Sequence, residues 1–394
     1  MSIKRKLILV VATVLVLALS LSVLVACVGK KDEDTGTTLV VDMLGRQHNI
    51  NLDSIERVVC IGAGSLRLYT YVGDMNKIVA VEEIEENAVM SQMFISKRPY
   101  QVANDTLFKS LIANGKTVGK GGPKAQVLDA EAIIANDPDI VFSTLSLTAE
   151  ELATAEAQIG CPIITLKYGN AKAFSEEIIM SINLVGKIMK ADAKATALTN
   201  YIKELKTDLA SKKVTSDDGK KVYLACNSNW GTKGFLSTSK NYPIFTISGI
   251  ENVMDAANIA LVDGFADLEA VVSSDADVII LDAGGLATFK SEYTATDSQL
   301  PGQLATMKAW NNKEVYLMMP NNAYDANVEM YFANAYFALT VAYPDVYGAN
   351  GTNPINIQEK VTEIMNHFYG KDMYSEILVY GGYQKLNLPE TWPA

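Results

Sequence analysis

Residues 130–142, AEAIIANDPDIVF, return in nearly the same form at residues 268–280, LEAVVSSDADVII. The offset between the two copies is 138 throughout, and acidic and apolar positions match in type. In each copy a short helical pattern leads into a β-branched apolar run, which is typical of a helix followed by a buried strand. The repeat therefore predicts a chain built from two similar units.

Short apolar runs lie on both sides of each copy and alternate with helical patterns. This order favours parallel sheets that are covered by helices on both faces. The predicted strands are 57–62, 77–81, 139–143 and 161–166 in the first unit, and 221–227, 277–282 and 314–319 in the second. A β-hairpin is predicted over 39–52, and residues 83–116 are predicted to be irregular.

Residues 172–212 form a long helical pattern between the two units. We therefore predict an α/β fold of two lobes with mostly parallel sheets, joined by a long α-helix. The expected boundaries are 39–170 for the N-terminal lobe, 171–213 for the helical segment and 214–394 for the C-terminal lobe. Ligands of open α/β sheets bind beyond the carboxyl ends of the strands, so we expect a ligand cleft between the lobes.

The N-terminus has the features of a bacterial export signal. Basic residues at positions 4–6 precede an uncharged apolar stretch over 7–26. The sequence LVAC ending at Cys27 has the pattern of a lipobox, so residues 1–26 are expected to be removed and Cys27 lipidated. The polar residues 27–38 would then form a flexible tether on the extracytoplasmic face of the cytoplasmic membrane. The alternative is an uncleaved signal anchor, because the apolar stretch is long enough to span a membrane.

Charge and cysteine content exclude several classes of function. Removing the three positive charges of the signal from the net charge of −11 leaves −14, which is unfavourable for binding nucleic acid. With Cys27 lipidated, three cysteines remain, and Cys60 and Cys226 are expected to be buried, unreactive thiols. The sequence has no CxxC spacing and only two histidines, so we expect no thiolate or imidazole metal site.

Signals for catalysis are sparse. His48 and His367 lie far in sequence from any candidate nucleophile, and the chain contains no GxSxG motif. The turn GAGSLR has Arg67 where a dinucleotide fingerprint requires its third glycine. We therefore predict no catalytic residue and no resident cofactor. Two alternatives remain open: a secreted two-lobed enzyme of a chelatase-like kind, because a cleft also suits catalysis, and a sensory lipoprotein.

Glu131 and Glu269 occupy the same position in the two copies of the repeat, two residues after Asp129 and Asp267. Both aspartates are expected to cap a helix, so both glutamates fall in a first helical turn. The helix dipole favours an acid there by about 0.3–1 kcal/mol. That explanation suffices for one glutamate, but the same acid on both lobes suggests a partner that contacts both.

Three segments resemble the substrate-binding proteins of ABC importers for ferric siderophores, cobalamin and haem: residues 38–52, 57–83 and 131–142. The resemblance extends over nearly all of 38–385. It implies two Rossmann-like lobes bridged by a long helix, with little hinge motion. It also implies that one glutamate of each lobe docks on arginines of a permease dimer, which acts with its ATPase.

By position in the family, the docking residues are Glu131 and Glu269. The second copy departs from the family pattern, since Ala276 stands in the place of Pro138. The family role implies a monomer, anchored to the membrane by its lipid, that carries a small-molecule metal chelate. A ferric siderophore is expected first, and a corrinoid or haem would use the same cleft.

The resemblance also places the ligand contacts in the loops that line the cleft. Arg98 and Tyr100 are added from the extra segment of the first lobe, because an arginine pairs with carboxylates and a tyrosine gives a flat contact. The predicted ligand-binding residues are Ser65, Arg98, Tyr100, Lys120, Gly121, Thr144, Asn229, Trp230, Gly285, Asn322 and Tyr324.

Overall fold

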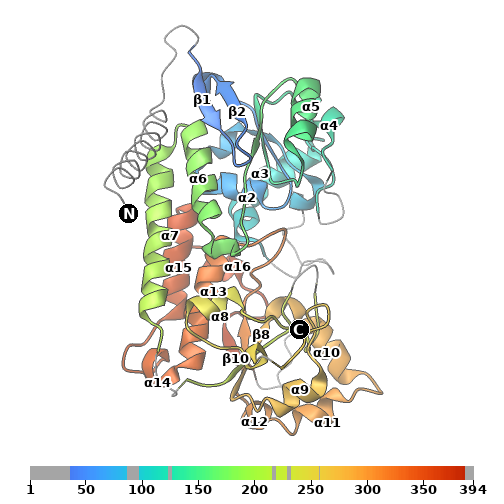
Figure 1. Ribbon diagram of the computed structural model, residues 1–394, viewed down its shortest axis with the longest axis vertical. Coiled ribbons are helices and arrows are strands. Elements are labelled where there is room, and N and C mark those ends of the chain that lie inside the picture. The colour runs from blue at the N-terminus through green and yellow to red at the C-terminus, as the bar shows by residue number, and fades with distance from the viewer. Residues whose placement is uncertain are drawn as a thin grey trace, which may run out of the picture.

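The computed structural model describes residues 36–86, 97–122, 127–214, 219–228, 232–256 and 258–386. It has two α/β lobes that are joined along one side by a layer of helices (Figure 1). The predicted fold class is confirmed. The predicted signal and lipidated Cys27 lie outside the described residues.

The chain enters the N-terminal lobe through the predicted hairpin, in which β1 (Thr38–Val41) pairs antiparallel with β2 (Gln47–Ile50). Asp42 holds the turn, because its side chain accepts hydrogen bonds from the backbone of Leu44 and Arg46 at 2.9 Å each. The backbone N–H of Met43 donates to the carbonyl of Thr165, which fixes the hairpin to the edge of the lobe.

The sheet of the N-terminal lobe is entirely parallel, with strand order β4-β3-β5-β6. Its strands are β3 (Val58–Ile61), β4 (Ile78–Ala80), β5 (Ile140–Ser143) and β6 (Ile163–Thr165). The connection from β3 to β4 runs to one side and the chain then returns to β5 on the other. This topology places a switch point between β3 and β5, where ligands of open parallel sheets commonly bind.

The helices of this lobe are α2 (Ser65–Val72), α3 (Pro99–Ala113), α4 (Ala130–Ile134) and α5 (Ala149–Ile159). The prediction that 83–116 is irregular was wrong, because α3 occupies much of this segment. Pro99 at the first turn pre-sets the helical φ angle. Asn104 then departs from helical geometry, with φ −126° and ψ 18°, and this kink interrupts the apolar period that sequence analysis looks for.

The sheet of the C-terminal lobe has the order β10-β9-β8-β7, with β7, β8 and β9 parallel and β10 antiparallel. The strands are β7 (Val222–Ala225), β8 (Val278–Asp282), β9 (Val315–Met318) and β10 (Gln384–Leu386). The helices around it are α8 (Pro243–Ile247), α9 (Leu268–Ser273), α10 (Leu286–Thr294), α11 (Leu300–Leu304), α12 (Lys308–Asn311) and α14 (Pro344–Tyr347).

The aspartates of the sequence repeat have the same structural roles in both lobes. Asp137 and Asp275 end their helices in the left-handed region, with φ values of 46° and 48°. Asp139 then accepts backbone hydrogen bonds from Glu56 and Arg57, at the entrance to β3. Its counterpart Asp277 accepts one from Lys221, at the entrance to β7. The repeat thus encodes a helix stop and a clamp on the neighbouring strand.

The helical layer contains α6 (Glu176–Ile188) and α7 (Asp192–Ser211), which turn at Lys190 with φ 56°. It also contains α13 (Val328–Ala342), α15 (Ile357–Tyr369) and α16 (Tyr374–Ile377) from the end of the chain. These late helices were assigned to the second lobe by sequence, yet α15 packs on α2 and α7, and α16 on α3. Figure 1 shows α7 and α15 side by side along the length of the molecule.

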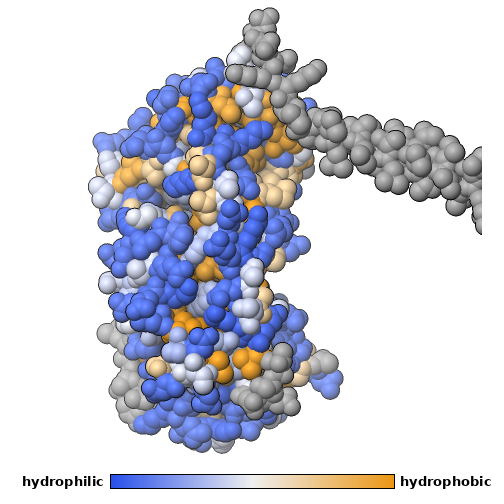
Figure 2. All heavy atoms as spheres, turned by 90° about the vertical axis from the view of Figure 1, so that its left-hand side faces the viewer, coloured by the Kyte–Doolittle hydropathy of each residue, from blue (hydrophilic) through white to orange (hydrophobic). Residues whose placement is uncertain are grey.

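The predicted burial of Cys60 and Cys226 is confirmed, and Cys161 is buried as well. The face of the molecule that carries α7 is mainly hydrophilic (Figure 2), with apolar residues gathered at the end where β1 begins. Leu39 and Val41 of β1 are two exposed apolar residues of that end. None of the helices in the described residues combines the length and the apolar character needed to cross a membrane.

Candidate functional site

The carboxyl ends of the two sheets face each other. The loop after β4 contacts the loop after β9 through the hydrogen bond between Glu82 and Tyr324. The switch point of the N-terminal lobe is formed by Gly62, Ala63 and Thr144. The Thr144 hydroxyl donates to the carbonyl of Ala63 at 2.9 Å. Gly62 has φ 85°, and a Cβ there would lie 2.8 Å from the Thr144 hydroxyl oxygen. Only glycine therefore allows this close approach of two loops.

Arg67 of α2 ties the two lobes together. Its buried guanidinium donates to the carbonyls of Ala323 at 2.6 Å, Ala326 at 3.0 Å and Tyr324 at 3.1 Å, all in the loop after β9. It also donates to the hydroxyl of Tyr168 at 3.1 Å, within the first lobe. Carbonyl dipoles and a neighbouring hydroxyl replace the water that this charge loses on burial.

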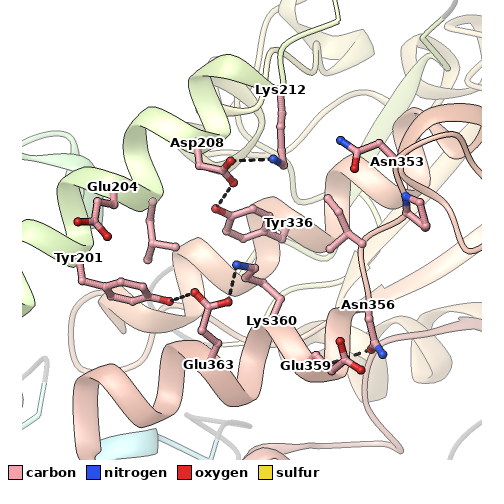
Figure 3. A pocket seen from close by; sticks show the side chains of 13 residues that line it. Tyr201, Glu204, Asp208, Lys212, Tyr336, Asn353, Asn356, Glu359, Lys360 and Glu363 are labelled. Carbon is pink, nitrogen blue, oxygen red and sulfur yellow. Dashed lines mark hydrogen bonds and ion pairs between the residues drawn. The ribbon is translucent and has the colours of Figure 1, made fainter.

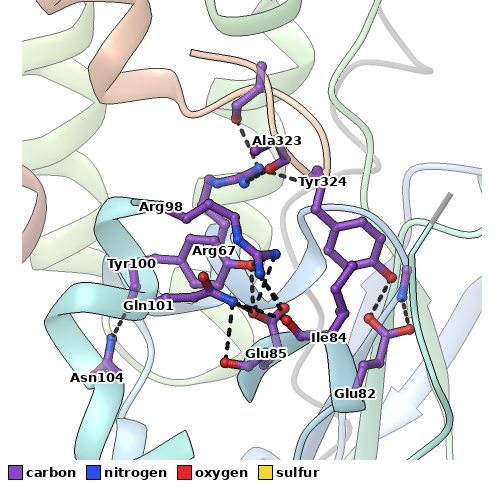
Figure 4. A network of polar contacts seen from close by, with 12 residues as sticks. Arg67, Glu82, Ile84, Glu85, Arg98, Tyr100, Gln101, Asn104, Ala323 and Tyr324 are labelled. Atoms are coloured by element: carbon purple, nitrogen blue, oxygen red, sulfur yellow. Dashed lines mark hydrogen bonds and ion pairs between the residues drawn. The ribbon is translucent and has the colours of Figure 1, made fainter. Parts of the chain in front are cut away.

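A second tie joins Glu82, the second residue after β4, to Tyr324 of the opposite lobe (Figure 4). The tyrosine hydroxyl donates to Oε2 of Glu82 at 2.6 Å, and Oε1 accepts from the backbone N–H of Gly62 at 3.1 Å. Burial raises the pKa of Glu82 to about 7, although both hydrogen bonds oppose the rise. Tyr324 has φ 52°, an uncommon value for a tyrosine, which its contacts to both Arg67 and Glu82 maintain.

A third tie lies deeper in the helical layer. Glu329 of α13 accepts hydrogen bonds from Tyr71 of α2 at 2.6 Å and from Tyr369 of α15 at 2.9 Å. We define the inter-lobe junction as Arg67, Tyr71 and Glu82 on one side and residues 323–329 on the other. The junction and the bridging helices hold the lobes in one relative position.

Sequence analysis missed the junction residues, although two signals were present. Arg67 is the one charged residue in an otherwise uncharged helical stretch, 65–72. Glu82 is the first acid after a predicted buried strand, at the end of the sheet where ligands are expected. Tyr71 and Glu329 gave no comparable signal, because their pairing depends on how the last helices pack.

Arg98 and Tyr100 do not face a cleft, contrary to the prediction. Both are buried, and the tyrosine hydroxyl donates to Oε2 of Glu85 at 2.7 Å (Figure 4). Arg98 donates to this hydroxyl at 3.1 Å and to the carbonyl of Ile84 at 2.9 Å. These side chains fix the start of α3 to the loop after β4, and we remove them from the proposed ligand contacts.

Three further predicted ligand residues are also buried. The Ser65 hydroxyl donates to the carbonyl of Phe142 at 2.9 Å, which anchors α2 on β5. Gly285 is packed so closely that a Cβ would lie 2.1 Å from the carbonyl oxygen of Lys233. Tyr324 belongs to the junction. Their roles within the protein leave almost no surface for a ligand.

Four predicted ligand residues have surface at the facing loops. Lys120 is exposed, and Gly121, Thr144 and Asn322 are partly exposed. Asn229 and Trp230 lie outside the described residues.

In the C-terminal lobe, Asp282 is buried at the end of β8, and this burial raises its pKa to about 6. Its carboxylate accepts from the backbone of Gly284 at 2.8 Å and of Ser228 at 3.1 Å.

Glu131 and Glu269 are both exposed, in the first turns of α4 and α9. Asp129 and Asp267 cap these helices as predicted, by accepting from backbone N–H groups. The two helices lie on the same side of the molecule, opposite α7 (Figure 1). With the described residues, neither glutamate side chain forms a hydrogen bond or an ion pair that would explain its presence.

A separate pocket of about 430 Å³ lies among α7, α13 and α15 (Figure 3). Asp208 accepts from the hydroxyl of Tyr336 and pairs with Lys212, both at 2.7 Å. On the other wall, Glu363 pairs with Lys360. These four charges are thus paired with one another, and Glu204 and Glu359 also line the pocket. Among the described residues no cluster of three or more His, Cys, Asp or Glu could hold a metal ion.

The fold and these loops define a two-lobed α/β protein whose sheet ends face each other. Residues 58–321 match the periplasmic binding protein family, and the chain belongs to that family. The family is described as one of binding proteins, in accord with the expected absence of an enzymatic role. The comparison with curated proteins finds no match.

Solved structures of similar fold share little sequence with this chain. A periplasmic solute-binding protein from Veillonella parvula is 20% identical over 86% of this chain and 95% of its own, with a TM-score of 0.60. An ABC transporter solute-binding protein from Sulfurospirillum deleyianum is 19% identical over 86% and 97%, with a TM-score of 0.57. The molybdate-bound MolA of Haemophilus influenzae is 16% identical over 85% and 98%, also with a TM-score of 0.57. At these identities the likeness concerns the fold.

Proposed function

We propose that this protein is an extracytoplasmic, lipid-anchored solute-binding protein that captures a metal chelate and delivers it to an ABC permease with its ATPase. The observation that carries the proposal is the pair of exposed glutamates, Glu131 and Glu269, at equivalent positions of the repeat, in the first turns of α4 and α9 on two joined lobes. An enzyme would not need this pair, whereas a carrier that docks on a two-part permease would.

The ligand is placed at the facing sheet ends, beside the switch point at Thr144. Lys120 supplies a positive charge there, while Glu82 is committed to the junction. The positive charge of Lys120 therefore favours an anionic chelate, and a ferric siderophore is the first candidate. The solved structures of similar fold include one that holds an oxyanion, molybdate. A corrinoid or haem would rely more on flat apolar contacts.

The test is a ligand panel on the purified chain. Intrinsic tryptophan fluorescence and thermal shift are measured against ferric siderophores, cobalamin, haem and molybdate, each over a concentration series. We expect saturable binding of one anionic chelate, weakened about tenfold by Lys120→Ala because a charged contact is lost. Lys203→Ala on α7 is the control, since this exposed lysine lies on a bridging helix. Turnover of any ligand, or absence of binding across the panel, contradicts the proposal.

The anchor is tested separately. Cys27→Ala should abolish incorporation of labelled palmitate and leave the signal uncleaved. A wild-type protein that incorporates no label contradicts the lipoprotein assignment without affecting the binding proposal.

A further inference from the structure

Exposed apolar side chains lie close in sequence to each of the two exposed glutamates. On the N-terminal lobe, Val127 is 77% exposed and Ile134 is 44% exposed. Ile134 lies three residues after Glu131 on α4, so the two side chains share one face of the helix. On the C-terminal lobe, Val262 is 72% exposed. Exposed apolar residues of this size are costly on a free surface and mark a contact site when they gather.

The C-terminal lobe adds a recess next to Glu269. A groove of about 620 Å³ is lined by the apolar side chains of Leu236, Phe265, Leu268 and Leu300, by Glu292 and by residues 295–299. Leu268 is the residue immediately before Glu269. An apolar group that contacted Leu268 in this groove would therefore lie one residue along α9 from the glutamate.

The rim of the groove is rigid. Val262 and Phe265 exchange two backbone hydrogen bonds at 2.9 Å across the turn of Asp263 and Gly264. Both turn residues have positive φ, 51° and 82°, as a tight type I′ turn requires. The next residue, Ala266, donates its N–H to Leu236, and Asp267 then caps α9. These hydrogen bonds fix the backbone from Val262 to the start of α9, and Phe265 and Leu268 of this segment line the groove.

The charge around the groove selects a basic partner. Glu292 and Asp297 line the groove, and three further exposed acids lie within two residues of Phe265 or Leu268 in the chain: Asp263, Asp267 and Glu269. Lys233 lies 5.5 Å from the centre of the Phe265 ring, in a cation–π contact, which shows that this ring accepts a cation. A matching partner would carry a basic side chain next to a large apolar one.

We infer that docking is not purely ionic. In this groove the C-terminal lobe receives an apolar side chain from a permease loop, and a basic residue next to that side chain pairs with Glu269. The inference rests on the proposed function. The N-terminal lobe offers a convex apolar surface, Val127 and Ile134, instead of a recess. The two docking sites therefore differ in shape while sharing charge, and this difference fixes which permease half each lobe contacts.

The test measures binding of the full chain to its permease in nanodiscs at about 0.05 M and 0.5 M NaCl, because high salt screens exposed ion pairs. Two variants test the apolar contact: Val262→Ser removes an exposed apolar side chain, and Thr296→Trp fills the groove. Each should weaken binding at least fivefold at both salt concentrations, because apolar burial does not depend on charge screening. Glu269→Gln should weaken binding chiefly at low salt. Met180→Ser, 55% exposed on α6, and Thr207→Trp on α7 are the matched controls and should bind as the wild type does.

The outcomes are distinguishable. If Glu269→Gln weakens binding while Val262→Ser and Thr296→Trp do not, the apolar contact is wrong and the proposed docking stands. If the wild-type protein does not bind its permease at either salt concentration, the proposed function and this inference both fail. Circular dichroism of each variant verifies that the loss of binding is not a loss of folding.

Discussion

Tyr324 of the C-terminal lobe donates its hydroxyl hydrogen to Glu82 of the N-terminal lobe across 2.6 Å. The carboxylate is buried, and burial raises its pKa to about 7 from an ordinary value of 4.5. A residue that joins the two lobes is therefore also one that changes charge near neutral pH.

Glu82 should make stability depend on pH. Because its folded-state pKa is raised, the folded protein holds a proton that the unfolded chain releases, and the stabilising contribution is complete below about pH 4.5. It is lost as the pH rises through about 7, and the total loss is roughly 3 kcal/mol. Urea unfolding of wild type and Glu82→Gln between these pH values measures the difference. Asp282 and Glu329, which also have raised pKa values, titrate in both proteins and cancel. Parallel pH profiles would contradict the prediction.

Removing the guanidinium of Arg67 should separate the lobes. Arg67→Met leaves three buried carbonyls in the loop after β9 without their donor, at a cost of about 3 kcal/mol. We expect calorimetry to show two thermal transitions in place of one cooperative transition. Arg98→Met is the matched control, because Arg98 is equally buried but bonds within one lobe. If both variants keep a single transition, Arg67 does not couple the lobes.

The aspartate clamps of the repeat should be structural in both lobes. Asp139→Ala removes an acceptor from two backbone N–H groups and should lower the free energy of unfolding by about 2 kcal/mol. Asp277→Ala should cost about 1–2 kcal/mol, since one backbone N–H and the exposed Lys308 lose their partner. Asp105→Ala, which breaks only an exposed pair with Lys109, should change stability by less than about 1 kcal/mol. Ligand affinity should be unaffected in all three.

The glutamates of the same repeat should affect transport and not binding. Glu131→Gln or Glu269→Gln should leave chelate affinity unchanged and lower uptake by cells. Lysine at both positions should nearly abolish uptake, because like charges would meet the basic partner and the two contacts act together. Glu150→Lys is the matched control, since Glu150 is also exposed in the first turn of a capped helix, α5. Normal uptake by a folded double-lysine protein would overturn the docking role.

Local patterns predicted the strands other than β10, the hairpin, the paired helix caps and the two-lobed α/β fold, because each depends on residues close in sequence. The site was harder, since Arg98, Tyr100 and Ser65 carry polar groups that suit a ligand equally well. Their partners, Glu85 and the carbonyls of Ile84 and Phe142, are identified only when the loops pack. Arg67 bonds to residues more than 250 positions away in the chain, a pairing that no local pattern encodes.

The hydrogen bonds at Arg67, Glu82 and Glu329 also affect which step of a transport cycle requires free energy, ligand binding or ligand release. A receptor whose lobes are fastened to each other by direct hydrogen bonds does not have to close around its ligand, so its affinity is not reduced by a scarcely populated binding-competent state. The same hydrogen bonds oppose any separation of the lobes that would release the ligand. A partner that pulled the lobes apart to free the cargo would first have to break three hydrogen bonds between a single buried guanidinium and the loop after β9.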